Sequence, residues 1–189
     1  MSLPDLSGRN ICILATHGFE ESELIQPRDD LKAAGANVTI VSPESGEIRG
    51  WKGDDWGQSV TVDAPLSGAR VEQHDALVLP GGQINPDLLR VDEEAMALIK
   101  AFADARKPIA AVCHAPWLLV EAGLAKGATL TGYKSIRTDL KNAGAHVVDQ
   151  EVAVDGNLIT SRCPDDLPAF SKAIADMVSE KAGARTEMV

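Results

Sequence analysis

A cysteine and a histidine stand side by side within Pro108–Gly123, PIAAVCHAPWLLVEAG. The apolar run before Cys113 predicts a strand, and the segment after His114 predicts a helix. At such a turn, free backbone N–H groups and the positive end of the helix favour a thiolate, so we expect a lowered pKa for Cys113. The stretch therefore predicts a nucleophilic cysteine on an elbow, although VCHAP lacks the flanking glycines of G-x-S-x-G. The alternative is that Cys113 is a small buried hydrophobe.

A pair of glycines follows a second apolar run, ALVLPGG. Gly81 and Gly82 allow the backbone to approach a bound group closely, and the N–H groups of Gly82 and His114 would form an oxyanion hole. The alternative is a turn whose glycines only adopt positive φ.

Three acids follow the first apolar run, in THGFEESE. Acids at a helix start usually complement the helix dipole, and this interpretation suffices for Glu20 and Glu21. Glu23 could instead reach Cys113 and share a proton with it.

The elements that must position these residues alternate between apolar strands and amphipathic helices. Strands are expected at 10–16, 38–41, 76–79 and 109–112, with helices at 23–34 and 95–103 between them. This alternation predicts an α/β fold of the flavodoxin-like type, a three-layer sandwich around a mainly parallel sheet. Reactive groups in such a sheet collect at the carboxyl ends of the strands, where the three loops above would converge.

The remaining segments predict smaller elements. EIRGWKGDDWGQSVTV, residues 47–62, fits a β-hairpin insertion. A short strand at 128–131 and a helix at 136–143 are expected next. EVAVDGNLIT then predicts a hairpin that turns at Asp155-Gly156, and residues 167–181 predict an amphipathic helix.

Composition excludes several classes of protein. The 189 residues suit a single domain, and a net charge of −10 without a basic stripe argues against a nucleic-acid partner. The chain has no apolar run long enough for a bilayer and no secretory signal pattern, so we expect no membrane partner and a cytoplasmic location.

Three widely spaced cysteines favour neither disulfides nor a metal site. No dinucleotide fingerprint or P-loop is present, so we expect no cofactor, and a nucleotide-binding flavodoxin-like module is the weakest hypothesis.

Several stretches together resemble the ThiJ/PfpI superfamily, and within it the PfpI-like proteins often named intracellular protease I or general stress protein. The matching stretches, in order, are GFEESEL, DWGQSVTVD, DALVLPGGQINPDLLR, KPIAAVCHAPWLLVEAG, TGYKSIRTDLKNAGA and VDQEVAVDGNLITSRCPDDLPAF. The resemblance implies one PfpI-like (class I glutamine amidotransferase-like) domain over residues 1–189.

The resemblance also implies roles for individual residues. Cys113 matches the family nucleophile, His114 its adjacent histidine, and Glu23 the acid that hydrogen-bonds the thiol. Gly82 matches the glycine whose N–H faces the active site. Asp87 matches an acid that orients the histidine of a neighbouring subunit, which implies a homodimer or higher oligomer.

Two positions depart from the family pattern. The loop GGQINPD is one residue longer between GG and PD, which weakens the assignment of Asp87. His17 stands where Asp or Asn is more usual; it either adds an imidazole for substrate binding near the mouth of the site or, as we favour, caps the turn.

Two functions compete on these residues. In the first, Cys113 attacks a carbonyl of a peptide or of a reactive dicarbonyl adduct, as in a peptidase, deglycase or glyoxalase of the stress response. In the second, the same thiol is a redox sensor that forms a stabilised sulfenic or sulfinic acid without turnover.

Overall fold

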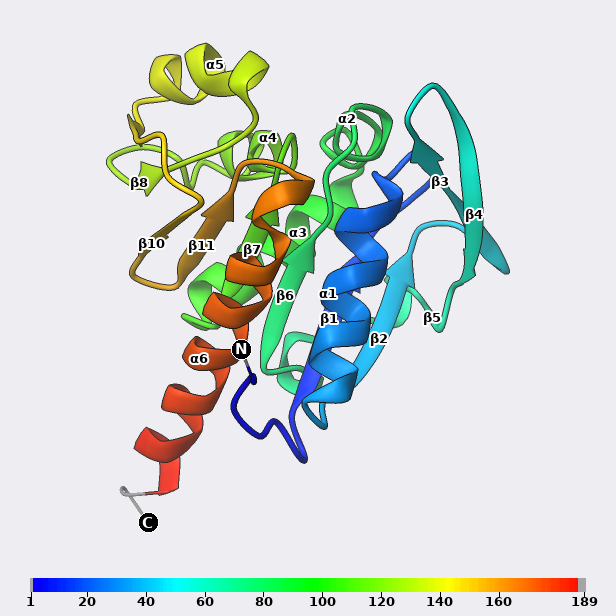
Figure 1. Cartoon of the computed structure of the whole chain (residues 1–189), viewed down its shortest axis with the longest axis vertical. Helices are drawn as coiled ribbons and strands as arrows, with labels where there is room; N and C mark the ends of the chain where they lie inside the picture. The colour runs from blue at the N-terminus through cyan, green and yellow to red at the C-terminus, as the bar shows by residue number, and fades with distance from the viewer. Residues whose placement is uncertain (1, 187–189) are drawn as a thin grey trace.

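The structure is a computed structural model that describes residues 2–186, with side chains described as far as Glu180. Its centre is a seven-stranded sheet in the order β10-β11-β7-β6-β1-β2-β5 (Figure 1). The strands are β1 (Asn10–Leu14), β2 (Asn37–Ser42), β5 (Ala64–Pro65), β6 (Ala76–Leu79), β7 (Ile109–Val112), β10 (Val152–Asp155) and β11 (Leu158–Ser161). All neighbours pair in parallel except β10, which is antiparallel to β11.

The chain changes its direction across the sheet at β1. From β1 the chain passes to β2 on one side, and later to β6 on the other side. The loops that follow β1 and β6 therefore leave the sheet in different directions, and ligands of open parallel sheets bind at such a point.

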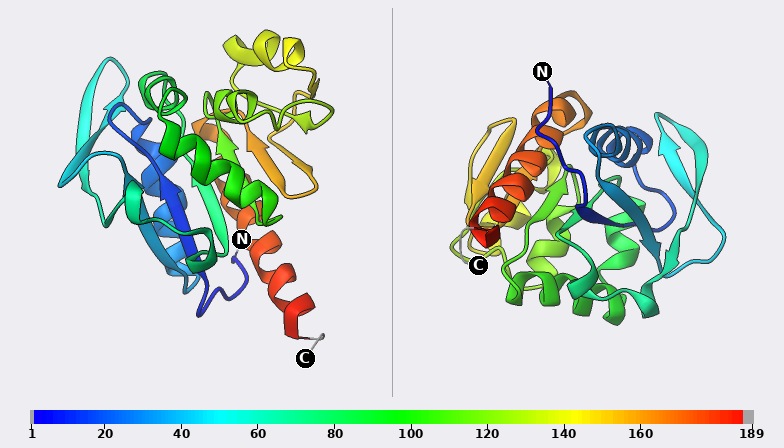
Figure 2. Two further views of the ribbon diagram at one scale, coloured as in Figure 1. Left: turned by 180° about the vertical axis from the view of Figure 1, so that it is seen from behind. Right: turned by 90° about the horizontal axis from the view of Figure 1, so that it is seen from below.

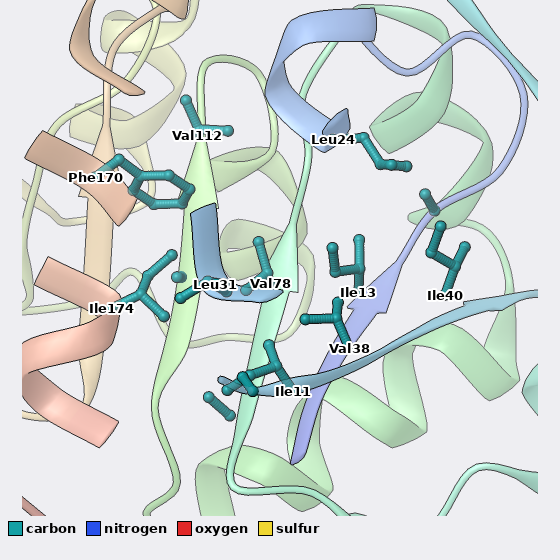
Figure 3. Packing of buried hydrophobic residues seen from close by; sticks show 14 of the residues in the cluster. Ile11, Ile13, Leu24, Leu31, Val38, Ile40, Val78, Val112, Phe170 and Ile174 are labelled. Carbon is teal, nitrogen blue, oxygen red and sulfur yellow. The ribbon is translucent and has the colours of Figure 1, made fainter. Parts of the chain in front are cut away.

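Helices cover both faces of the sheet (Figure 2). Three helices are long, namely α1 (Glu21–Ala33), α3 (Glu93–Asp104) and α6 (Leu167–Thr186), and two are short, namely α4 (Pro116–Glu121) and α5 (Arg137–Asn142). Residues alternate between faces along β1: Ile11 and Ile13 pack toward α1 and α6 (Figure 3), whereas Cys12 and Leu14 pack toward α3 and α4. Two apolar cores thus enclose the sheet, and the expected three-layer sandwich is confirmed.

The hairpin expected at residues 47–62 is present as β3 (Glu47–Lys52) and β4 (Asp55–Thr61). Glu21 holds it against α1, because its Oε2 accepts a hydrogen bond from the Gln58 N–H at 2.7 Å and its Oε1 pairs with Lys52 Nζ at 3.0 Å. Glu21 is therefore an anchor for the hairpin as well as an acid in the first turn of a helix.

One local expectation was wrong. The second hairpin turns at Gly156-Asn157, one residue later than expected: Asp155 pairs with Leu158, and the Asp155 carboxylate accepts a hydrogen bond from the Thr129 N–H at 2.7 Å. The short strand expected near 128–131 is present as β8 (Thr129–Leu130), which pairs outside the main sheet with β9 (His146–Val147).

The loop after β6, for which no helix or strand was predicted, contains a short helix, α2 (Ile84–Leu89). The buried Asn85 side chain fixes its start by donating to Pro80 O at 2.8 Å and accepting from the Thr16 N–H at 2.8 Å. Pro86 lies in the first turn, where a missing N–H costs no helical hydrogen bond. Among the described residues, no helix is long and apolar enough to cross a membrane.

Candidate functional site

The loops that follow β1, β6 and β7 converge on a cavity of about 690 Å³. The cavity is lined by Gly18, Glu20, Glu23, Trp51, Gly53, Gly82, Gln83, Ile84, Cys113, His114, Tyr133 and Pro164. Cys113, His114, Glu23 and Gly82, which the sequence pointed to, lie together there. The convergence expected from the parallel sheet is therefore found.

Cys113 occupies the turn between β7 and α4 with a φ of 63°. A positive φ is unfavourable for a residue with a side chain and stores on the order of 1–3 kcal/mol of strain. The surrounding backbone holds the turn, because the Cys113 N–H donates to Ser161 O at 3.0 Å and Cys113 O accepts from the Tyr133 N–H at 2.8 Å. The thiol lines the cavity while the residue is only 5% exposed.

Glu23 lies in the first turn of α1 and is completely buried. Its Oε2 accepts a hydrogen bond from the Gly81 N–H at 3.0 Å, and its Oε1 makes no standard hydrogen bond within the described chain. Burial, with a smaller contribution from the charge of Glu20, raises the pKa of Glu23 to about 8, although its hydrogen bond with the Cys113 thiol acts in the opposite direction. The carboxyl is thus able to give or take a proton near neutral pH.

The Cys113 thiol does not have the lowered pKa that its place at a helix start predicted. Burial is the largest influence and raises its pKa, and the Glu23 carboxylate raises it further. The N–H groups of Gly82 and His114 donate toward the sulfur and act in the opposite direction, as expected, but they are outweighed. Two adjacent buried acids cannot easily both ionise, so Cys113 and Glu23 act as a coupled pair.

The two glycines are required by close packing. A Cβ on Gly81 would lie 2.7 Å from Cys113 Cβ and 2.7 Å from Val112 O, and would overlap Glu23 Oε2. Gly82 has a φ of 82°, and a Cβ there would overlap Gly18 O. Any side chain at Gly81 would therefore separate the Cys113 thiol from the Glu23 carboxyl.

His114 is buried beside the thiol, with its Nδ1 3.1 Å from Cys113 Sγ. Its Nε2 lies 3.2 Å from Ser135 Oγ, and its ring stacks on Tyr133 with centroids 4.8 Å apart. Burial lowers the pKa of His114, which favours the neutral imidazole.

Asp87 and His17 lie away from the thiol. Asp87 is exposed on α2, and its carboxylate forms no hydrogen bond or ion pair with the described side chains or backbone of this chain. His17 Nδ1 accepts a hydrogen bond from the Arg49 N–H at 3.0 Å, which ties the loop after β1 to β3. This contact matches the turn-capping alternative, and His17 is not among the residues that line the cavity.

Several residues at the site were not singled out by the sequence. Glu20 was interpreted as a dipole acid, yet it lines the cavity, and burial raises its pKa. Tyr133 and Ser135 lie in the matching stretch TGYKSIRTDLKNAGA, but no role was assigned to them. Trp51 lies in the expected hairpin and was assigned no role at the site, whereas Asn85 could have been suspected from its place beside the glycine pair. In the part of the chain that the structure describes, no cluster of three or more His, Cys, Asp or Glu side chains could hold a metal ion.

Comparison with known proteins decides the family. The sequence profile of the DJ-1/PfpI family matches residues 9–177. This chain belongs to the DJ-1/PfpI family.

Individual members of the family are similar over most of their length. General stress protein 18 of Bacillus subtilis is 43% identical over 167 residues, covering 87% of this chain and 95% of that protein. Protein/nucleic acid deglycase 2 of Escherichia coli is 42% identical over 166 residues, covering 87% and 94%. The crystal structure of Drosophila melanogaster DJ-1beta superposes with a TM-score of 0.82 at 30% identity, covering 96% of this chain and 98% of that one. The resemblance to this superfamily, first noted from the sequence, is confirmed.

Proposed function

We propose that this DJ-1/PfpI protein is a cysteine-dependent enzyme of the stress response that acts on reactive dicarbonyl compounds or their adducts, with Cys113 as the nucleophile. One observation carries the proposal. The Cys113 thiol faces a cavity on a strained turn, beside a buried carboxyl of Glu23 whose pKa is about 8. That arrangement offers a nucleophile and a proton carrier at one reacting centre.

The chemistry can be followed with methylglyoxal as the substrate. The Cys113 thiolate attacks the aldehyde carbon, and the resulting oxyanion is held by the N–H groups of Gly82 and His114 before it takes up a proton. Glu23 gives its proton to the oxyanion, and as the carboxylate it then removes the hydrogen from that carbon and returns it to the neighbouring carbon. The product of this internal redox rearrangement is a lactoyl thioester on sulfur. Water cleaves the thioester to lactate and frees the thiol, so methylglyoxal plus water gives lactate.

The names of two relatives support this direction. One relative is named a general stress protein and another a protein/nucleic acid deglycase, and both are more than 40% identical to this chain. Peptide hydrolysis remains the second activity to test on the same nucleophile, because acyl transfer uses the same thiolate and oxyanion donors.

The test measures methylglyoxal consumption, lactate formation and dipeptide cleavage with wild type and Cys113→Ala. Cys163→Ala is the matched control, because Cys163 is partly exposed and hydrogen-bonds Asp166 rather than the cavity residues. We expect lactate formation by wild type and by Cys163→Ala, and background rates for Cys113→Ala. Full activity of Cys113→Ala on both substrate types would overturn the proposal.

A redox role is the second candidate, and Glu23 is the observation that favours it. A carboxyl with a pKa of about 8 carries a proton at neutral pH and could donate a hydrogen bond to an oxygen on the Cys113 sulfur. Intact-mass measurement after mild peroxide tests this role: one or two added oxygens confined to Cys113 support it, and oxidation spread over all three cysteines argues against it.

Assembly and location complete the proposal. The exposed Asp87 lies next to Leu88, which is 47% exposed, and near Val91, which is 79% exposed. Such an apolar pair beside an unpaired acid suits a contact with a second copy, which we propose as at least a dimer. We also propose a cytoplasmic location.

A further inference from the structure

Both ring nitrogens of His114 have a partner within this one chain. Nδ1 lies 3.1 Å from the Cys113 sulfur, and Nε2 lies 3.2 Å from the Ser135 hydroxyl. The imidazole therefore bridges the thiol to Ser135. No carboxylate among residues 2–186 forms a hydrogen bond with this ring.

Aromatic neighbours prevent the imidazole from turning. The Tyr133 ring stacks on it at an interplanar angle of 28°, and the Trp117 ring meets it edge-on with centroids 5.3 Å apart. Trp117 is itself fixed, because its Nε1–H donates to Asp139 Oδ2 at 2.8 Å. Nδ1 thus stays directed at the sulfur, and only the position of the proton on the ring is left to be decided.

Ser135 is fixed to the same frame as the thiol. It lies in the 3-10 helix η3 (Lys134–Ile136), which follows directly on Tyr133, whose N–H donates to Cys113 O at 2.8 Å. The next residue, Ile136, is fully buried. The hydroxyl is thus held against Nε2 by backbone contacts to Cys113 and by packing.

We propose that Ser135 is a positioning residue that keeps the proton of neutral His114 on Nε2, so that the free Nδ1 accepts the proton of the Cys113 thiol. The proposal rests on the function proposed above, because it assigns the base that forms the thiolate. When the S–H bond breaks, its proton moves to Nδ1 and leaves a thiolate beside an imidazolium. Nε2–H still donates to Ser135 Oγ in that state, so no hydrogen bond is lost.

The Cys113 thiol and the Ser135 hydroxyl both favour the tautomer of His114 that carries its hydrogen on Nε2. Burial keeps the Cys113 thiol protonated, and the Glu23 carboxyl, which carries its own proton at neutral pH, does not need the thiol hydrogen. Nδ1 accepts that hydrogen only when it carries none itself. A serine hydroxyl can accept from Nε2–H and give its own hydrogen to water, and Ser135 is exposed to water. A carboxylate at Nε2 would instead favour the imidazolium at all times. Asp87 of a second copy would compete for this same nitrogen.

The test reads the tautomer directly, by ¹⁵N NMR of histidine-labelled protein at a pH where His114 is neutral. His114→Gln assigns the signal among the four histidines. We expect the Nε2–H form in wild type, in Ser135→Thr and in the control Ser67→Ala, an exposed serine distant in the fold. In Ser135→Ala we expect a mixture of tautomers. An Nδ1–H form in wild type, or an unchanged tautomer in Ser135→Ala, would overturn the proposal.

Turnover supplies the second readout. We expect Ser135→Ala to lower kcat for methylglyoxal on the order of tenfold, less than the 10²–10⁴-fold effect of losing a base outright, with KM unchanged. Ser135→Thr should restore the rate, because it keeps the hydroxyl. A rate that Thr does not restore, or a loss in Asp87→Asn with none in Ser135→Ala, would contradict the proposal. The NMR readout needs no substrate, so it stays valid if methylglyoxal proves not to be turned over.

Discussion

Two groups of residues meet at the Cys113 sulfur, and they differ in kind. The first, the acid side, consists of Glu23, Gly81 and Gly82 from α1 and the loop after β6. The second, the imidazole side, consists of His114, Tyr133 and Ser135 from the chain after β7. The acid side is fully enclosed and leaves no space for an added carbon, whereas the imidazole side extends to a hydroxyl exposed to solvent.

The difference shows two ways of holding a proton near a buried thiol. On the acid side, burial raises the pKa of Glu23 to about 8, so the carboxyl carries a proton at neutral pH. On the imidazole side, burial lowers the pKa of His114, so the ring stays neutral and is able to accept a proton. Burial therefore favours the uncharged form of both groups, the protonated carboxyl of Glu23 and the neutral imidazole of His114.

The largest effect is expected from Gly81→Ala, which would break the acid side. The new methyl group would overlap the Glu23 carboxyl and contact Cys113 Cβ and Val112 O. We expect loss of activity and a fall in unfolding free energy of about 1–3 kcal/mol, measured by urea denaturation. Gly68→Ala is the matched control, because its Cβ would meet only Pro65 at 3.7 Å, and it should change stability by less than about 0.5 kcal/mol. Equal effects of the two variants would contradict the packing argument.

Glu23→Gln tests the raised pKa of Glu23 through the pH dependence of the unfolding free energy. The folded state holds a proton on Glu23 up to a pH of about 8, whereas the unfolded chain loses it near the ordinary value of 4.5. Between these values the folded state binds more protons, so stability falls as pH rises, by at most about 1.4 kcal/mol per pH unit. The Gln variant lacks this contribution, so its unfolding free energy should decrease less between pH 5 and 8. A slope identical to that of wild type would show that Glu23 does not titrate in this range.

Asn85→Ala removes the support beneath the acid side. The buried amide links Pro80 O, Gly81 O and the Thr16 N–H, so its loss leaves buried backbone groups unpaired. We expect a loss of about 1–3 kcal/mol in thermal or urea unfolding, together with weaker catalysis, because Gly82 is displaced. Unchanged stability would mean that water replaces the amide.

The smallest effects are expected on the imidazole side, at Tyr133. Tyr133→Phe keeps the ring stacked on His114, and we expect activity within about twofold of wild type. Tyr133→Leu removes the stack, which is worth about 0.5–1.5 kcal/mol, and should lower kcat by a factor of about 2–10. A loss in Phe as large as in Leu would assign the role to the hydroxyl instead of the ring.

The sequence predicted the acid side better than the imidazole side, for a physical reason. Gly81 and Gly82 follow β6, and Glu23 lies in the first turn of the helix that follows β1. The topology alone brings the ends of those two strands together. Ser135 and Tyr133 lie in a loop after β8, a strand outside the main sheet, so no periodicity located them. The pKa of Cys113 was predicted in the wrong direction because the helix start was visible in the sequence, whereas the extent of burial was not.

The claim that Cys113 and Glu23 titrate as a coupled pair is tested most directly by the pH dependence of Cys113 alkylation. The rate with iodoacetamide is followed by mass spectrometry of the Cys113 peptide in wild type and in Glu23→Gln, with the Cys163 peptide as internal reference. Because the carboxylate raises the pKa of the thiol, we predict that the Gln variant reacts at lower pH than wild type. A profile that stays in place or moves to higher pH would contradict the claim.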